Sequence, residues 1–168
     1  MKRLFLGINE PAMFWLCLLF VVLLDQIVKY LVSANMHLGE SQPLVEGLVY
    51  LTYVRNSGAA FSILQGQRWL FLVITPAVLG VMLWYIRGVP KSDKLLRLAL
   101  ALFCGGALGN YLDRLRFGAV TDFIDFRFFP VFNVADSCIV IGVALLGWCI
   151  LIRSKKDDDK EDNDVHAA

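Results

Sequence analysis

Four long apolar stretches constrain this chain more than any other feature of its sequence. A helix needs about 20 mostly apolar residues to cross the hydrocarbon core of a bilayer. Stretches of that kind occupy residues 12–32, 69–87, 95–112 and 133–152. The chain has 168 residues and is 58% hydrophobic but only 18% charged, whereas soluble domains are about 25% charged. The sequence therefore predicts a mainly α-helical integral membrane protein with four transmembrane helices.

The first stretch has some features of a cleaved leader, because Lys2 and Arg3 precede it and residues 32–34 resemble a cleavage site. Its apolar part is longer than the core of a normal signal peptide, however, and Asp25 and Lys29 interrupt its end. We therefore expect this stretch to be retained as a membrane anchor.

Lys and Arg residues are distributed unevenly between the links that join the apolar stretches. They are most frequent before residue 12, in the link between the second and third stretches, and after residue 152. Because cytoplasmic loops carry an excess of Lys and Arg, both termini are expected in the cytoplasm. Residues 33–68 and the loop 113–132 then lie on the outer side.

The first outer segment contains LVYLTYVR, residues 48–55, which is rich in β-branched and aromatic residues and is flanked by Gly47 and Asn56. This composition is typical of a strand, so we expect a small outer β-sheet within residues 34–67, between the first two helices. Residues 155–168 contain KKDDDKEDND, a charge run that cannot bury apolar surface and is expected to be disordered. Residues 1–154 then form one membrane domain.

Several function classes lack their sequence signatures here. The net charge is +1 and no basic stripe carries interleaved aromatics, so no nucleic-acid partner is expected. His37 and His166 are isolated, HExxH and GxSxG are missing, and no metal or other cofactor is expected. The cysteines form no CxxC pair, which disfavours a thiol oxidant and leaves them as small hydrophobic residues. They are Cys17, Cys104, Cys138 and Cys149.

Strongly polar residues near the predicted membrane boundaries all fall on the expected outer side. Placing an ionisable group at membrane depth costs about 2.5–3.5 kcal/mol on insertion scales, so such groups usually have a function. The residues are Asp25, Lys29, Asn56, Asn110, Asp113, Arg114, Asp122, Asp125, Asn133 and Asp136. Their convergence predicts a site at the outer boundary.

Some of these residues also have purely structural interpretations. Asn133 is a good N-cap, and Asp136 would then be the third residue of the helix, where an acid meets free N–H groups. Asp25 and Lys29 are four residues apart on one helix face and can pair. Asp122 lies between apolar neighbours in VTDFIDF, where an idle loop carboxylate is not expected.

Two carboxylates held together at a partly dry site can share one proton, because both cannot easily ionise at close range. The ionised member can take a proton from water, and the protonated member can donate to a carbonyl oxygen under attack. This chemistry hydrolyses a peptide bond without a metal or a covalent intermediate. A small four-helix proton-coupled transporter, with Asp25 as the proton carrier, is the alternative from another class.

Five motifs in order then resemble the bacterial lipoprotein signal peptidases, also called signal peptidase II. The resemblance spans most of residues 20–142. The motifs are Asp25-Gln26 with Lys29, Asn56-Ser57-Gly58-Ala59-Ala60-Phe61, Gly109-Asn110-Tyr111-Leu112-Asp113-Arg114, Gly118-Ala119-Val120-Thr121-Asp122-Phe123 and Phe132-Asn133-Val134-Ala135-Asp136.

The resemblance implies four membrane helices and an outer β-cradle in the bacterial inner membrane, with an aspartic endopeptidase site near the outer face. It implies that Asp122 and Asp136 are the catalytic pair. Residues that bind substrate or brace the site would be Asn56, Gly58, Asn110, Arg114 and Asn133. Residues with a structural role would be Asp25, Lys29 and Asp113.

The implied substrates are prolipoproteins that carry a diacylglyceryl group on a cysteine, with the cut just before that cysteine. Membrane lipids are the other expected partners, and we take a monomer as the working expectation. Thr121 stands where the family usually has Val, a near-isosteric change with little expected effect. The stretch between Asp122 and Asn133 is shorter than in many members, which affects contacts with substrate or inhibitor there.

Overall fold

The structure is a computed structural model of the chain, in which residues 10–58 and 64–166 are described. Side chains are described for residues 12–58 and 64–153. The helices are α1 (Glu10–Asn35), α2 (Arg68–Tyr85), α3 (Lys94–Phe117) and α4 (Val134–His166). The strands are β1 (Ser41–Val45), β2 (Val49–Asn56) and β3 (Val120–Asp125). The predicted mainly helical architecture with a small sheet is confirmed.

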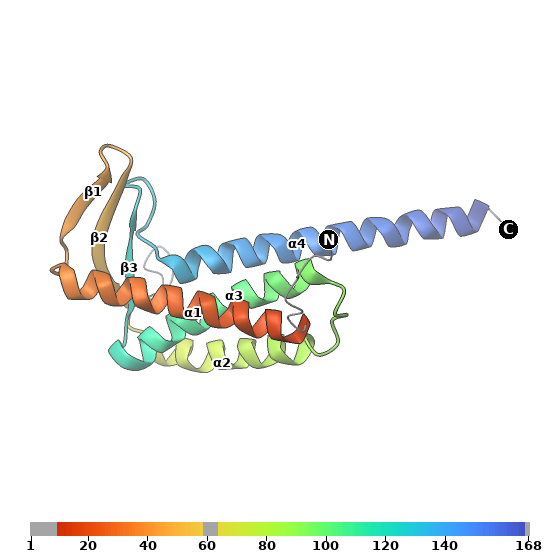
Figure 1. The fold of residues 1–168 in the computed structure, drawn as a ribbon, viewed down its shortest axis with the longest axis horizontal. Coiled ribbons are helices and arrows are strands. Elements are labelled where there is room, and N and C mark those ends of the chain that lie inside the picture. Colours follow the sequence, from red (N-terminus) through yellow and green to blue (C-terminus); the bar gives the residue numbers. More distant parts are fainter. Residues whose placement is uncertain (1–9, 59–63, 167–168) are drawn as a thin grey trace, which may run out of the picture.

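The four helices run alongside one another, and the sheet lies at one end of them (Figure 1). All four are long and apolar enough to cross a membrane, over 12–35, 68–85, 94–117 and 134–153. Successive helices alternate in direction, so α1 and α3 end near the sheet, whereas α2 and α4 begin there (Figure 1). The fold therefore gathers the polar ends of α1, α3 and α4 on one side.

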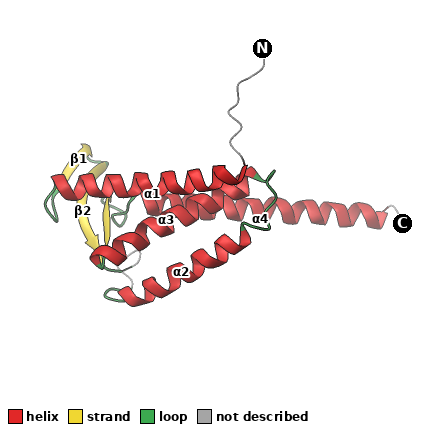
Figure 2. Ribbon diagram, turned by 60° about the horizontal axis from the view of Figure 1, so that its bottom comes forward, coloured by secondary structure: helices red, strands yellow, loops and turns green. Residues whose placement is uncertain are grey.

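Helix α3 is the central helix, and the other three pack against it. Figure 2 shows α2 at the side of the bundle, where it packs on α3, and none of its residues is buried. Large apolar side chains such as Phe20, Ile27 and Trp148 are exposed on the outer helix faces, as expected where lipid replaces water.

Glycines on α3 allow the neighbouring helices to come very close. A Cβ atom at Gly105 would lie 2.8 Å from Cβ of Val21 on α1. A Cβ atom at Gly109 would lie 2.5 Å from Oδ2 of Asp25, and one at Gly106 would overlap the carbonyl oxygen of Ala135 on α4. Small residues at these positions let the backbones approach. They thereby place the first turn of α4 against α1 and α3.

The sheet is antiparallel with the order β1-β2-β3. The predicted strand over 48–55 is confirmed as β2 (Figure 1). The prediction that the sheet lies wholly within residues 34–67 is incomplete, because β3 comes from the segment after α3 and pairs with β2. Asp122 is opposite Val54 in this pairing, so it lies on a buried strand and not in a loop. The rigid ladder gives that carboxylate a defined position.

Two helices, α3 and α4, extend well beyond their predicted C-terminal ends. Helix α3 continues past residue 112 to Phe117, and Gly118 ends it in the left-handed conformation at φ 75°. Helix α4 continues to His166, where the sequence predicted a disordered tail from residue 155. Adding a residue to an existing helix costs far less free energy than nucleating a new helix. This explains how the helix of the apolar span continues into the polar tail.

Two parts of the sequence predictions lie outside the described residues. They are the basic pair Lys2 and Arg3, which contributed to the predicted orientation, and Ala59-Ala60-Phe61, the second half of one motif.

Candidate active site

Asn133 precedes α4 and caps its first turn, as the sequence predicted. Its Oδ1 accepts a hydrogen bond from the backbone N–H of Asp136 at 2.8 Å. In return, Oδ2 of Asp136 accepts from the backbone N–H of Asn133 at 3.3 Å. The other oxygen of Asp136 accepts from Nδ2 of Asn110 on α3 at 2.7 Å. The cap and Asn110 together fix the orientation of the Asp136 carboxylate.

Asp122 enters the same network from β3. Its Oδ1 accepts from Nδ2 of Asn133 at 2.6 Å, and its Oδ2 accepts from Nδ2 of Asn56 at 2.9 Å. Only 2% of the Asp122 surface is exposed. Asn133 therefore bonds to both acids, to Asp122 through its side chain and to Asp136 through its backbone N–H. One residue thus links the first turn of α4 to the third strand.

Burial and, as a smaller cause, the negative charge of Asp136 raise the pKa of Asp122 to about 7. The hydrogen bonds from Asn56 and Asn133 and the charge of Lys29 oppose this rise in pKa. Among the described residues, no Lys or Arg forms an ion pair with Asp122 or Asp136. Asp122 can therefore hold a proton near neutral pH.

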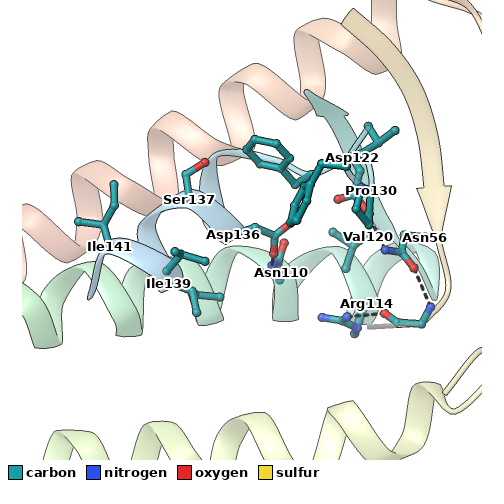
Figure 3. Close-up of a pocket in the computed structure, with 15 residues that line it drawn as sticks. Asn56, Asn110, Arg114, Val120, Asp122, Pro130, Asp136, Ser137, Ile139 and Ile141 are labelled. Atoms are coloured by element: carbon teal, nitrogen blue, oxygen red, sulfur yellow. Dashed lines mark hydrogen bonds between the residues drawn. The ribbon is translucent and has the colours of Figure 1, made fainter. Parts of the chain in front are cut away.

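A cavity of about 510 Å³ opens beside the two acids (Figure 3). Its polar lining consists of Asn56, Gly58, Asn110, Arg114, Asp122, Asp136 and Ser137. Its apolar lining comes from the start of β3, the loop before α4 and the second turn of α4. These residues are Val120, Phe129, Pro130, Val131, Phe132, Ile139, Val140 and Ile141. Every predicted catalytic or supporting residue lines this cavity except Asn133, which lies buried behind it.

Arg114 braces one wall of the cavity and does not pair with its neighbour Asp113 among the described ion pairs. Its Nη2 donates to the carbonyl oxygen of Gly58 at 2.9 Å, and its guanidinium lies 4.3 Å from the ring centroid of Phe71 on α2. The N–H of Gly58 donates to Oδ1 of Asn56 at 2.9 Å (Figure 3). This chain of contacts orients the amide of Asn56 so that its NH₂ group faces Asp122.

Asp25, Lys29 and Asp113 form a second polar cluster beneath the cavity. Nζ of Lys29 lies 2.9 Å from Oδ2 of Asp25 and 3.2 Å from Oδ2 of Asp113. It also donates to Oδ1 of Asn110 at 2.9 Å. The predicted pairing of Asp25 with Lys29 is confirmed, and the bond to Asn110 explains why the NH₂ group of that amide faces Asp136.

Asp25 and Asp113 each accept a hydrogen bond from the backbone next to one of the two acids that line the cavity. Oδ1 of Asp25 accepts from the N–H of Ala135 at 2.9 Å, in the first turn of α4. Oδ2 of Asp113 accepts from the N–H of Thr121 at 2.9 Å, next to Asp122 on β3. The cluster therefore fixes the backbone on both sides of the site.

Asp125 is the other acid in DFIDF, and the structure keeps it away from the cavity. It accepts from Oγ1 of Thr52 at 2.7 Å and from the backbone N–H of Arg127 at 2.7 Å. It also lies within ion-pair distance of the Arg127 guanidinium, at 3.4 Å. These contacts give Asp125 a role in joining the strands and the following turn.

The apolar wall was not predicted from the sequence. Ile139, Val140 and Ile141 lie within a continuous apolar span, and nothing in such a span distinguishes a cavity wall from a lipid-facing side chain. The part of the chain that the structure describes holds no group of three His, Cys, Asp or Glu side chains arranged to bind a metal ion. The site consists of two carboxylates bonded to asparagine side chains, with the Arg114 guanidinium in the cavity wall.

Comparisons with known proteins agree with this arrangement. The family model for signal peptidase (SPase) II matches residues 17–152. The lipoprotein signal peptidase of Shouchella clausii is 46% identical over 146 residues, which cover 86% of this chain and 97% of that protein. The lipoprotein signal peptidase of Halothermothrix orenii is 50% identical over 134 residues, which cover 80% of this chain and 92% of that protein.

Two solved structures have the same fold. One is a bacterial membrane enzyme solved by the in meso method at 2.3 Å resolution, with a TM-score of 0.83, 34% sequence identity and coverage of 86% of this chain and 91% of that one. The other, solved at 1.9 Å, has a TM-score of 0.77, 35% identity and coverage of 83% and 93%. The matched segment, the relatives and the shared fold show that this chain is a peptidase of the signal peptidase II family.

Proposed function

We propose that this protein is an aspartic endopeptidase that removes signal peptides from lipoprotein precursors, with Asp122 and Asp136 as its catalytic pair. Its relatives carry the name lipoprotein signal peptidase, which supports the substrate class. The observation that carries the mechanism is that both carboxylates line one cavity and bond to the same residue, Asn133. The bond cut is the one just before a cysteine that bears a diacylglyceryl group.

In the proposed reaction, the pair starts with one proton, held by Asp122. The Asp136 carboxylate takes a proton from a water molecule as the water oxygen attacks the carbonyl carbon of the scissile bond. Asp122 donates its proton to the carbonyl oxygen, which gives a neutral tetrahedral intermediate. When the C–N bond breaks, the nitrogen of the leaving cysteine takes the proton from Asp136, and a hydroxyl proton returns to Asp122. The products are a new carboxyl group and a new amine.

The apolar wall of the cavity suits a substrate that stays in the bilayer. Ile139, Val140 and Ile141 project from the membrane-spanning part of α4, so acyl chains can lie against them while the peptide reaches the acids. Trp69 at the start of α2 and Trp84 at its end are 76% and 70% exposed, as expected for side chains at the two membrane interfaces. This supports a site close to headgroup depth.

We propose that the protein lies in the bacterial inner membrane with the sheet on the outer side and both termini in the cytoplasm. Basic side chains at the end of the bundle opposite the sheet support this orientation, because cytoplasmic loops favour Lys and Arg. They are Arg87, Lys91, Lys94, Arg97 and Arg153. Residues 1–154 form the proposed peptidase domain, so removal of residues 155–168 should leave cleavage intact.

The contacts of Asp25 disfavour the transporter alternative. A proton carrier must exchange protons with both sides, but Asp25 is fully buried and lies within 2.9 Å of Nζ of Lys29. Its other oxygen is bonded to the N–H of Ala135. These bonds give Asp25 a fixed structural role, whereas the cavity reaches Asp122 and Asp136.

The test is a cleavage assay with purified protein. A precursor with a diacylglyceryl-modified cysteine is incubated with the protein in detergent or lipid, with a metal chelator present, and the released signal peptide is measured. We expect cleavage by the natural chain and none by Asp122→Asn or Asp136→Asn. Cleavage that disappears with the chelator, or that persists in either variant, would refute the aspartic mechanism.

A further inference from the structure

A second cavity adjoins the first at Asp122. It has a volume of about 240 Å³ and shares Asn56, Asp122, Pro130 and Val131 with the larger cavity. Its own walls come from the end of β2 and from the turn before α2. Because the two cavities share the Asp122 side chain, a peptide whose scissile bond lies at Asp122 can extend into both.

The two cavities differ in polarity and in their place in the fold. The larger one is walled by aliphatic residues of the membrane-spanning part of α4. The smaller one is lined by Arg55, Ser57 and Gln65, and none of these residues lies in a membrane-spanning segment. An acylated portion of a substrate therefore fits the first cavity, and a polar portion fits the second.

Arg55 is held in place without an acidic partner among the described residues. Its Nε donates to the hydroxyl oxygen of Tyr53 at 3.0 Å, and its guanidinium carbon lies 4.3 Å from the ring centroid of Phe117 and 5.6 Å from that of Tyr53. Its Nη1 is buried and has no hydrogen-bond partner within residues 10–58 and 64–166. A pre-oriented guanidinium without a carboxylate can bind an acidic side chain or a peptide carbonyl of a ligand.

We infer that this second cavity binds the residues that follow the lipid-modified cysteine, and that Arg55 selects an acidic side chain there. The inference rests on the proposed cleavage reaction and adds a specificity to it. The part of the substrate after the cysteine must leave the membrane for water, and the second cavity is the polar one. Arg55 and Asp122 are the ionisable groups among its described lining residues, and a protonated Asp122 leaves the cavity with a net positive charge.

The experiment uses three precursors that differ only in the residue after the modified cysteine, which is Asp, Asn or Lys. For the natural chain we expect kcat/KM to be highest for Asp and lowest for Lys. A partly exposed charge pair is worth a factor of roughly five. Arg55→Gln should remove the preference for Asp over Asn, mainly through KM, because Arg55 does not touch the bond that breaks.

A second variant tests the cavity without disturbing the contacts of Arg55. Gln65 is exposed and lines the cavity, so Gln65→Glu adds a negative charge there at nearly constant shape. It should lower kcat/KM for the Asp precursor and raise it for the Lys precursor. Gln67→Glu is the matched control, because Gln67 is exposed in the same turn but does not line the cavity. It should leave the preference unchanged.

The outcomes separate the two proposals. Equal cleavage of all three precursors by the natural chain would overturn the inference while the peptidase function stands. A preference that survives both Arg55→Gln and Gln65→Glu would overturn it as well. If Arg55→Gln does not fold, the precursor series and Gln65→Glu still decide. Absence of any cleavage by the natural chain would overturn the proposed function and this inference together.

Discussion

The protein contains two clusters of buried carboxylates whose surroundings differ sharply. Asp25 and Asp113 share the ammonium group of Lys29 and bond to backbone N–H groups of α4 and β3. Asp122 and Asp136 are bonded to asparagine side chains and to a backbone N–H, without an ion pair in the described structure, and they face a cavity. The first cluster contains a cation and is closed, and the second contains no cation and is open to a ligand.

The difference shows how one fold places aspartate side chains in two kinds of buried environment. A buried carboxylate with a cation and several donors is stable as a fixed charge, but a buried carboxylate without a cation tends to keep a proton. Asn110 connects the clusters, because its Oδ1 accepts from Lys29 while its Nδ2 donates to Asp136. The closed cluster therefore orients the open one.

Loss of a cavity carboxylate should have the largest effect. Asp122→Asn or Asp136→Asn should lower the cleavage rate by at least about a hundredfold, because each removes one partner of the proposed proton transfer. The variants should stay folded, since an amide keeps the shape of the side chain. Rates from the precursor assay, with near-ultraviolet circular dichroism as a check of folding, provide the test. If Asp25→Asn reduces the rate more than these two variants in equally folded protein, the two clusters have been assigned the wrong roles.

The closed cluster should matter most for stability. Lys29→Met leaves Asp25 and Asp113 buried without a cation, and removal of one partner of a buried pair typically costs about 3–5 kcal/mol. The free energy of unfolding in detergent, from denaturant titration, measures this loss. Lys91→Met is the control, because Lys91 is exposed in the loop between α2 and α3 and should change stability by less than about 0.5 kcal/mol. Equal stabilities for the two variants would show that Lys29 does not stabilise the buried carboxylates of the cluster.

The open cluster should instead make stability depend on pH. The pKa of Asp122 is about 7 in the folded protein and 3.8 for the free side chain, so between these values the folded state binds more protons than the unfolded state. The contribution of Asp122 to the free energy of unfolding is therefore complete below about pH 4 and is lost as the pH rises toward 7. The loss is about 3 kcal/mol between pH 5 and pH 8. The cleavage rate should also fall above pH 7 as Asp122 loses its proton.

Thermal unfolding of the natural chain and of Asp122→Asn at pH 5 and pH 8 isolates this contribution. The natural chain should lose more stability between the two pH values than the variant, which has no titrating group at this position. Identical losses in the two proteins would mean that Asp122 is already ionised in the folded state at pH 5.

Much of this arrangement was predictable from local sequence patterns. Hydropathy indicated four spans, and the Asn133–Asp136 spacing indicated the cap that the structure confirms. The i,i+4 spacing of Asp25 and Lys29 predicted their ion pair. Each span depends on the composition of one continuous stretch, and the cap and the ion pair depend on neighbours within about one helical turn, so these features can be predicted from local sequence.

Several features that depend on specific contacts between distant segments were not predicted. The pairing of β3 with β2, which places Asp122 on a strand, requires knowledge of how the segment after α3 folds back. The small-xxx-small spacing of Gly105 and Gly109 favours close helix packing, but it does not show that α1 and α4 are the partners, on which the bond from Ala135 to Asp25 depends. Local sequence patterns do not distinguish Arg55, because its position beside the second cavity follows from the register of the sheet.

The smallest expected effect is at Asp125, which belongs to neither cluster although it lies three residues from Asp122. Its oxygens accept from Thr52 and from the N–H of Arg127, so Asp125→Asn should cost about 1 kcal/mol of stability. The cleavage rate should stay within about threefold of the natural value, because Asp125 does not line the cavity and takes no part in proton transfer. Thr52→Val is the control, since it removes the same contact from the other side and should have a similar small effect. If Asp125→Asn were as inactive as Asp122→Asn while Thr52→Val cleaved normally, Asp125 itself would be one of the catalytic acids, and the division into an open and a closed cluster would be incomplete.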